Sequence, residues 1–147
     1  MTGVWVVVAT LVVAGIAGAL LNARNGRVRQ ASKARQEKAA GLPAPVAKVL
    51  DTGARVTLVQ ISTTFCTPCR HTRAMLGPLA ERTDGLTHVD LDVTDQPEVA
   101  QALGVLRTPT TIAYRSDGTE LLRVGGVPKR DTLLEALQPH LPARITD

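Results

Sequence analysis

The chain has 147 residues, of which 44% are hydrophobic and 2% aromatic, and its formal net charge is +4. About 100 residues can bury one adequate core, so this length leaves no room for a second large domain beside an N-terminal apolar segment. The positive charge is concentrated between Arg24 and Lys38, just after the apolar N-terminal segment. The basic composition is therefore not evidence for a nucleic-acid-binding domain.

Residues 3–21 contain no charged side chain and predict one transmembrane helix. At about 1.5 Å per residue, a run of this length covers most of a hydrocarbon core about 30 Å thick. A cleaved signal peptide is the main alternative, although such peptides normally begin with basic residues and have a shorter apolar run. A buried soluble helix is a further alternative. We assign residues 1–21 to a transmembrane anchor.

Residues 22–45 form a basic linker next to this anchor. Between Arg24 and Lys38 there are six basic residues and one acid, a net charge of +5 that would be attracted to anionic lipid. Basic residues beside a membrane span favour the cytoplasmic side, and none precedes this span. We therefore expect a single-pass membrane protein whose domain is cytoplasmic. An exported domain, supplied with electrons by a membrane partner, is the alternative.

Residues 46–147 alternate predicted strands and helices in one α/β domain. Val46–Leu50 fits either a short strand or one helical turn. Gly77–Pro78 falls inside the first predicted helix and is expected to kink or shorten it. Strand, helix and strand in succession predict a parallel crossover, and Ser116–Gly118 predicts a hairpin turn. The predicted strands are Val56–Ser62, Leu86–Val93, Thr110–Tyr114 and Glu120–Val124, and the predicted helices begin near Pro68 or span Asp95–Leu103 and Pro128–Leu137.

Cys66 and Cys69 are the only cysteines and stand in C-x-x-C spacing where a strand is predicted to lead into a helix. Pro68 between them has a backbone angle suited to a first helical turn. Unpaired N–H groups and the positive end of the helix dipole would favour a thiolate at Cys66, and thiolates are the nucleophiles of disulfide exchange. Cys69, one turn later, could attack a mixed disulfide at Cys66 and release the reduced partner.

Two other interpretations of this cysteine pair remain open. Tetrahedral zinc needs four ligands, so Cys66, Cys69 and the neighbouring His71 would require a further ligand from another chain. The pair could also be inert. The sequence thus favours a thiol-disulfide oxidoreductase over a redox-inactive or metal-handling binding module, and it predicts no cofactor and no resident metal.

Five motifs recur along the predicted strands, helices and turns: Phe65–Arg70, Val89–Val93, Gly104–Val105, Thr108–Thr110 and Asp117–Gly118. Through these motifs, Leu58 to Leu137 resembles the thioredoxin family. The resemblance implies a thioredoxin-like fold, a central mixed sheet flanked by helices, and disulfide exchange with protein substrates. A reductase or a membrane electron donor would be a second partner.

The resemblance also implies the residues that meet the substrate. Pro109 is expected to be cis and to face the cysteine pair, and the backbone beside it is expected to pair with the substrate chain. The expected substrate-binding residues are Phe65, Thr67, Pro68, Thr108 and Pro109.

Several residues near the cysteines depart from the family pattern. Gln60 stands where the family has a buried aspartate, which helps to take the proton of the second thiol, and glutamine cannot ionise. Phe65 replaces the usual tryptophan, Thr67 replaces the usual glycine, and Asp90 stands where the family has a lysine. These departures affect the expected general reductase activity more than the dithiol chemistry itself.

Four other charged or titratable residues are interpreted from their positions in the sequence. His71 would add positive charge close to Cys69, and Arg107 lies near the expected substrate groove. His88 and His140 are expected to be surface or packing residues.

Overall fold

A five-stranded mixed sheet forms the centre of the computed structural model, which describes residues 2–31 and 41–142. β2 and β3 run parallel, and the other neighbouring pairs run antiparallel, which confirms the expected mixed sheet. In spatial order the strands are β1 (Val28–Gln30), β5 (Glu120–Gly125), β4 (Thr110–Arg115), β2 (Val56–Ser62) and β3 (Leu86–Asp92).

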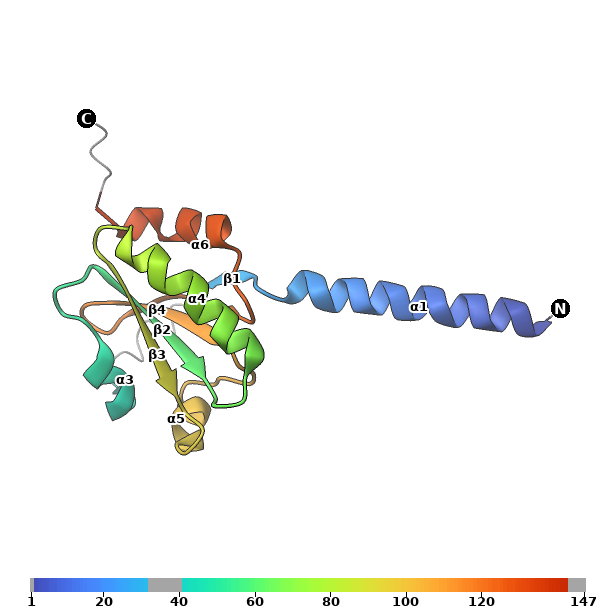
Figure 1. The fold of residues 1–147 in the computed structure, drawn as a ribbon, viewed down its shortest axis with the longest axis horizontal. Helices are drawn as coiled ribbons and strands as arrows, with labels where there is room; N and C mark the ends of the chain where they lie inside the picture. Colours follow the sequence, from blue (N-terminus) through green and yellow to red (C-terminus); the bar gives the residue numbers. More distant parts are fainter. Residues whose placement is uncertain (1, 32–40, 143–147) are drawn as a thin grey trace.

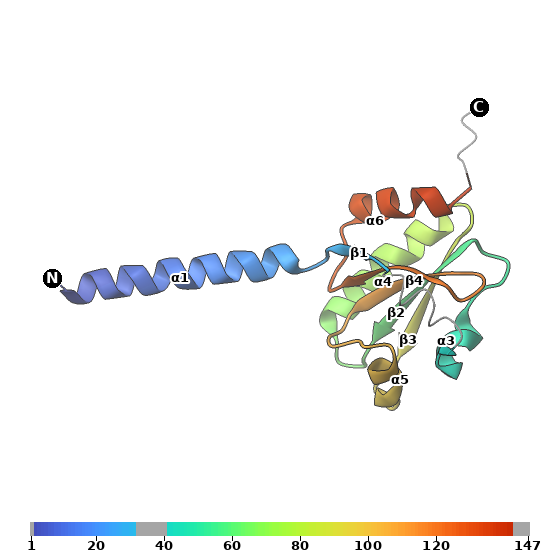
Figure 2. The ribbon, with the colours of Figure 1, turned by 180° about the vertical axis from the view of Figure 1, so that it is seen from behind.

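The sheet has helices on both faces, and β2 supplies core residues to each. All seven residues of β2 are buried, as suits a β-branched and aliphatic central strand. Leu58 packs in the core cluster under α4 (Thr67–Glu81) and α6 (Arg130–Leu137). Ile61 packs in the cluster under α3 (Ala44–Val49) and α5 (Pro97–Ala102). Figures 1 and 2 show the two layers from opposite sides.

Helix α4 begins at Thr67 and continues three residues past Pro78 to Glu81. Of the two expected effects, Pro78 does not end the helix, and a kink at this position stays a prediction. Proline lacks the N–H that would bond the carbonyl of Ala74. Both residues are exposed, so water can satisfy this carbonyl and the helix continues.

The remaining predicted elements are present with small shifts of their ends. Val46–Leu50, which the sequence left undecided, belongs to helix α3 and its C-cap. Helix α5 is followed by Gly104 with a positive φ of 63°, as expected for a glycine after a helix. β4 and β5 form the expected hairpin. Leu133 and Leu137 of α6 are fully buried, and the 3₁₀ turn η2 (Gln138–His140) follows.

Strand β1 was not predicted from the sequence, because residues 22–45 were interpreted as a linker. Val28–Gln30 pairs with Leu122–Val124 of β5, and Ala31 N donates to Leu121 O at 2.9 Å. The strand exists because the edge of β5 offers unpaired backbone groups, and no local apolar pattern marks it. The part of the basic linker at 32–40 lies outside the described residues.

Helix α1 (Thr2–Arg24) extends away from the sheet, as Figures 1 and 2 show. It is long and apolar enough to cross a membrane, a description that a signal sequence near the N-terminus also meets. Three residues, Asn25 to Arg27, separate it from β1.

Candidate active site

Cys66 and Cys69 are joined by a disulfide across the first turn of α4. Their Cα atoms are 5.2 Å apart, an ordinary separation for bonded cysteines. Cys66 is the N-cap of the helix, and its Sγ accepts a hydrogen bond from the backbone N–H of Cys69 at 3.1 Å. After reduction, this donor and the positive end of α4 would stabilise a thiolate at Cys66.

The two sulfurs differ in access. Cys69 is 1% exposed, whereas Cys66 is half-buried. The residues around Cys66 are open to solvent, and Phe65 is 96% exposed, with Thr67 and Pro68 exposed as well. A disulfide of another protein can therefore approach Cys66 but not Cys69.

The turn that leads from β2 to Cys66 is held by the end of β3. Thr64 N donates to Thr94 Oγ1 at 2.9 Å, and Thr64 Oγ1 donates to Asp92 Oδ2 at 3.1 Å. Hydrogen bonds from the side chain and backbone of Thr94 lower the pKa of Asp92, so this carboxylate stays ionised. The sequence did not indicate this role for Asp92 and Thr94, because it depends on the parallel pairing of β2 with β3.

The Thr108–Pro109 peptide bond is cis, as the resemblance implied. Pro109 directly precedes β4, whose Thr110 pairs with Ile61 at the end of β2. Because β2 leads directly to the cysteine turn, Pro109 and Cys66 lie at the same end of the sheet, where β2 finishes and β4 begins. We call this end the active-site edge of the sheet. The loop is fixed on both sides, since Thr110 Oγ1 donates to Arg107 O at 2.7 Å and Gly126 N donates to Pro109 O at 2.7 Å.

Gln60 lies fully buried beneath the cysteine helix. Its Nε2 donates to the carbonyl oxygen of Cys69 at 2.9 Å, and its Oε1 lies 3.2 Å from His88 Nε2. An amide oxygen can only accept, so His88 must donate from Nε2. Gln60 therefore links the carbonyl of Cys69 to an imidazole on β3.

His88 was expected to be a surface or packing residue, and its bond to Gln60 gives it a further contact. The register pairs Leu58 with His88 and Gln60 with Asp90, so all four side chains lie on the face under α4. Burial lowers the pKa of His88, with the negative charge of Asp90 opposing this and the positive charge of Arg73 adding to it. The imidazole is therefore neutral near pH 7.

Arg73 and Asp90 complete the polar layer, which we define as Gln60, Arg73, His88 and Asp90. Asp90 Oδ2 forms an ion pair with Arg73 Nη2 of α4. Asp90 Oδ1 is buried and has no hydrogen-bond partner within residues 2–31 and 41–142. Asp90 thus joins β3 to the cysteine helix α4.

His71 and Arg107 lie outside the polar layer. His71 is exposed on α4, and Arg107 is exposed while its Nη2 donates to Gly125 O at 3.1 Å. Across the described parts of the chain, no three His, Cys, Asp or Glu side chains are grouped to hold a metal ion.

Comparisons with known proteins agree with this geometry. The thioredoxin family model matches residues 45–139. Thioredoxin of Staphylococcus saprophyticus is 33% identical over 87 residues, which cover 58% of this chain and 83% of that protein. Thioredoxin of Mycobacterium tuberculosis is 35% identical over 86 residues, covering 58% and 73%.

Solved structures show the same likeness. A mutant thioredoxin from Halobacterium salinarum matches with a TM-score of 0.56 and 25% identity, over 63% of this chain and 80% of that one. Thioredoxin f from spinach chloroplast matches with a TM-score of 0.55 and 26% identity, over 66% and 84%.

Proposed function

Since this chain belongs to the thioredoxin family and is a thioredoxin-type thiol-disulfide oxidoreductase, we propose that it works while tethered to a membrane and exchanges disulfides with protein partners. The observation that carries the proposal is the Cys66–Cys69 disulfide at the start of α4, at the same sheet edge as Pro109. The apolar helix α1 supports the membrane tether.

The exchange begins with the dithiol form. The Cys66 thiolate attacks one sulfur of a partner disulfide, a mixed disulfide forms, and the other partner sulfur leaves as a thiolate that takes a proton. Cys69 then loses its proton and attacks the sulfur of Cys66, which releases the second partner thiolate and leaves the Cys66–Cys69 disulfide. Two electrons pass to the partner, and a reductase or a membrane electron donor restores the dithiol.

We assign substrate contacts to the residues around the exposed sulfur. Phe65, Thr67 and Pro68 are exposed beside Cys66 and can contact an incoming chain. Thr108 and Pro109 lie at the same sheet edge, where backbone next to a cis proline can pair with an extended segment of the partner.

We also propose the division of the chain and its placement in the cell. Residues 1–21 would be the anchor, 22–45 the basic linker that also supplies β1, and 46–147 the main part of the thioredoxin-like domain. Arg24 ends α1, and Arg27 and Arg29 follow it; basic residues on this flank of the span favour a cytoplasmic domain. A membrane-impermeant thiol reagent, applied to intact cells after gentle reduction, tests this. Modification of Cys66 without lysis would overturn the cytoplasmic assignment.

Disulfide exchange by the full chain tests the function. A fragment that begins at residue 41 would lack β1, so the whole protein in detergent is the appropriate sample. Reduced protein mixed with a small aromatic disulfide should be oxidised rapidly to the Cys66–Cys69 disulfide, whereas Cys66→Ser should react far more slowly. Equal rates for wild type and Cys66→Ser would contradict the proposal. The reduction potential of the same sample then gives the direction of electron flow.

A further inference from the structure

The register of the sheet brings the chain from α1 to the edge that carries the active site. Val28 at the start of β1 pairs with Val124 near the end of β5. Gly125 pairs with Thr110 at the start of β4, and Thr110 pairs with Ile61 near the end of β2. The end of α1 and the turn to the cysteines therefore meet the same edge of the sheet.

The connection at this edge is short. Three residues, Asn25 to Arg27, lie between α1 and β1, and even a fully extended link of this length spans only about 10 Å. In the sheet, β1 and β2 are three strand spacings apart, so the strand that leads to Cys66 lies only about 14 Å from the strand that follows α1. The domain therefore cannot move far from the end of α1.

The link is also packed against the domain. Gly26 N donates to Gly125 O at 2.9 Å, and Gly26 is buried with a φ of 72°. A Cβ atom at Gly26 would collide with the carbonyl oxygen of Val127, so only glycine fits this close approach. The adjacent Gly126 donates to Pro109 O, which joins this region to the cis-proline loop. On the other side, Arg27 Nε donates to Ala23 O of α1 at 2.8 Å, so the link is bonded both to the domain and to the helix, which restricts rotation of the domain about α1.

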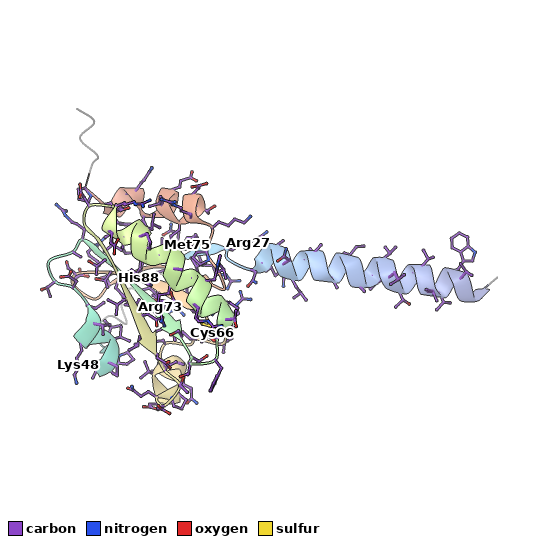
Figure 3. All side chains as sticks on the ribbon, viewed as in Figure 1. Arg27, Lys48, Cys66, Arg73, Met75 and His88 are labelled. Atoms are coloured by element: carbon purple, nitrogen blue, oxygen red, sulfur yellow. A yellow bond between two sulfur atoms is a disulfide. The ribbon has the colours of Figure 1, made fainter. Side chains whose placement is uncertain are left out.

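We propose that the active-site edge of the sheet, which carries Cys66, faces the membrane surface. The protein partner is then an integral membrane protein whose disulfide lies close to the bilayer. This inference rests on the proposed membrane tether. Figure 3 shows Cys66 on the side of the domain from which α1 projects, and Lys48 on the opposite side. A disulfide far above the membrane would have to approach around the domain.

The exposed side chains at this edge fit such a partner. Outside α1, and within the residues described, the large apolar side chains that stand exposed are Phe65 at 96% and Leu106 at 97%. Phe65 precedes Cys66, and Leu106 lies in the loop before Thr108. Arg27 and Arg29 are exposed at the same edge and suit the anionic headgroup region. Apolar side chains beside a basic surface match the juxtamembrane segment of a membrane protein.

Reconstituted vesicles test the inference. The full chain, first reduced to the Cys66–Cys69 dithiol that supplies the two electrons, is placed in phosphatidylcholine and phosphatidylserine vesicles together with a designed transmembrane peptide that carries a disulfide. In one peptide the disulfide lies next to the bilayer, and in the other a helical spacer of about 20 residues holds it about 30 Å away. We expect the near disulfide to be reduced at least about tenfold faster, because the near site is within reach of the short link. Equal rates, or faster reduction of the distant disulfide, would overturn the inference.

A flexible insertion gives the matched variant. About 20 Gly and Ser residues between Arg24 and Asn25 leave the Gly26 contacts intact but give the domain a reach of about 25 Å. The preference for the near disulfide should then disappear, while the same insert after Asp147 should preserve it. A preference retained by the first insertion would contradict the geometry.

Two controls separate this inference from the proposed function. The exchange rate with the small soluble disulfide should be the same in all three proteins, and its absence in wild type would refute the dithiol function itself. Flotation should find the chain with the vesicles after an alkaline wash, and a chain left in solution would refute both the tether and the inference.

Discussion

Cys66 and Cys69 stand in the same helical turn, yet they lie in opposite surroundings. Cys66 is half-buried beside exposed residues, and its Sγ accepts a hydrogen bond from Cys69 N at the start of α4. Cys69 is 1% exposed, and its carbonyl is bonded to Gln60 of the buried polar layer. This difference supports the proposal that the sulfur of Cys66 meets the partner and that of Cys69 reacts inside the protein. The second must lose its proton without an ionised carboxylate at position 60.

The largest expected effect separates the roles of the two cysteines. In Cys69→Ser, the Cys66 thiolate can still attack a partner, but no internal thiol resolves the product, so mixed disulfides should accumulate. In Cys66→Ser the remaining thiol is buried, so trapping should be nearly absent. Non-reducing electrophoresis after incubation with a disulfide-containing protein measures both. Equal trapping by the two variants would contradict the assignment of Cys66 as the attacking residue.

The surroundings of Cys66 could be predicted from the sequence because they depend on nearby residues. The C-x-x-C spacing, Pro68 and the apolar run of β2 each act within a few residues, and they predicted a strand, a turn and a helix correctly. The cis bond at Pro109 required the family resemblance, since the local sequence permits either isomer.

The polar layer beneath Cys69 and strand β1 could not be predicted in the same way. The bond from Gln60 to His88 depends on which residues of β3 lie beside β2, and a shift of one residue would turn His88 to the other face. Strand β1 likewise depends on the edge of β5, and its residues Val28–Gln30 carry no strand pattern of their own. Pairing between distant segments decides both features.

A second, smaller effect tests whether the polar layer limits turnover. Gln60→Asp introduces a carboxylate beneath Cys69, whereas Gln60→Asn has the same size and cannot ionise. General bases typically contribute 10²- to 10⁴-fold, and we expect the aspartate variant to turn over about tenfold faster than the asparagine variant at neutral pH. A reductase assay with a protein disulfide measures the ratio. Equal turnover would indicate that another group accepts the proton of Cys69.

Gln60→Asp should be less stable than Gln60→Asn at neutral pH, although it is expected to turn over faster. Both lose the contacts of the longer glutamine, but only the aspartate variant buries a carboxylate where Gln60 is fully buried. Burial without full hydrogen bonding disfavours the charged form. Denaturant unfolding of the oxidised proteins measures the free energy of unfolding of both variants. The deficit of the aspartate variant relative to the asparagine variant should be larger at neutral pH than at low pH. The reverse order would show that the polar layer accommodates a charge.

The smallest effect concerns the pH dependence contributed by His88. Burial lowers its pKa in the folded protein, so below the usual value near 6.5 the unfolded chain binds a proton that the folded chain resists. Protons then favour unfolding, and stability falls as the pH decreases from that value toward the lowered pKa. His88→Asn keeps a donor for Gln60 but does not titrate, so it should lose less stability than wild type between about pH 7 and about pH 5.

His140 is the matched control, because burial and then the charge of Arg115 also lower its pKa, and it lies at the other end of the domain in η2. His140→Asn should also reduce the pH dependence, but only His88 is linked through Gln60 to the carbonyl of Cys69. Reduction of the disulfide should therefore shift the NMR titration of His88 and leave that of His140 unchanged. Equal shifts of both imidazoles would mean that the polar layer does not communicate with the cysteine pair.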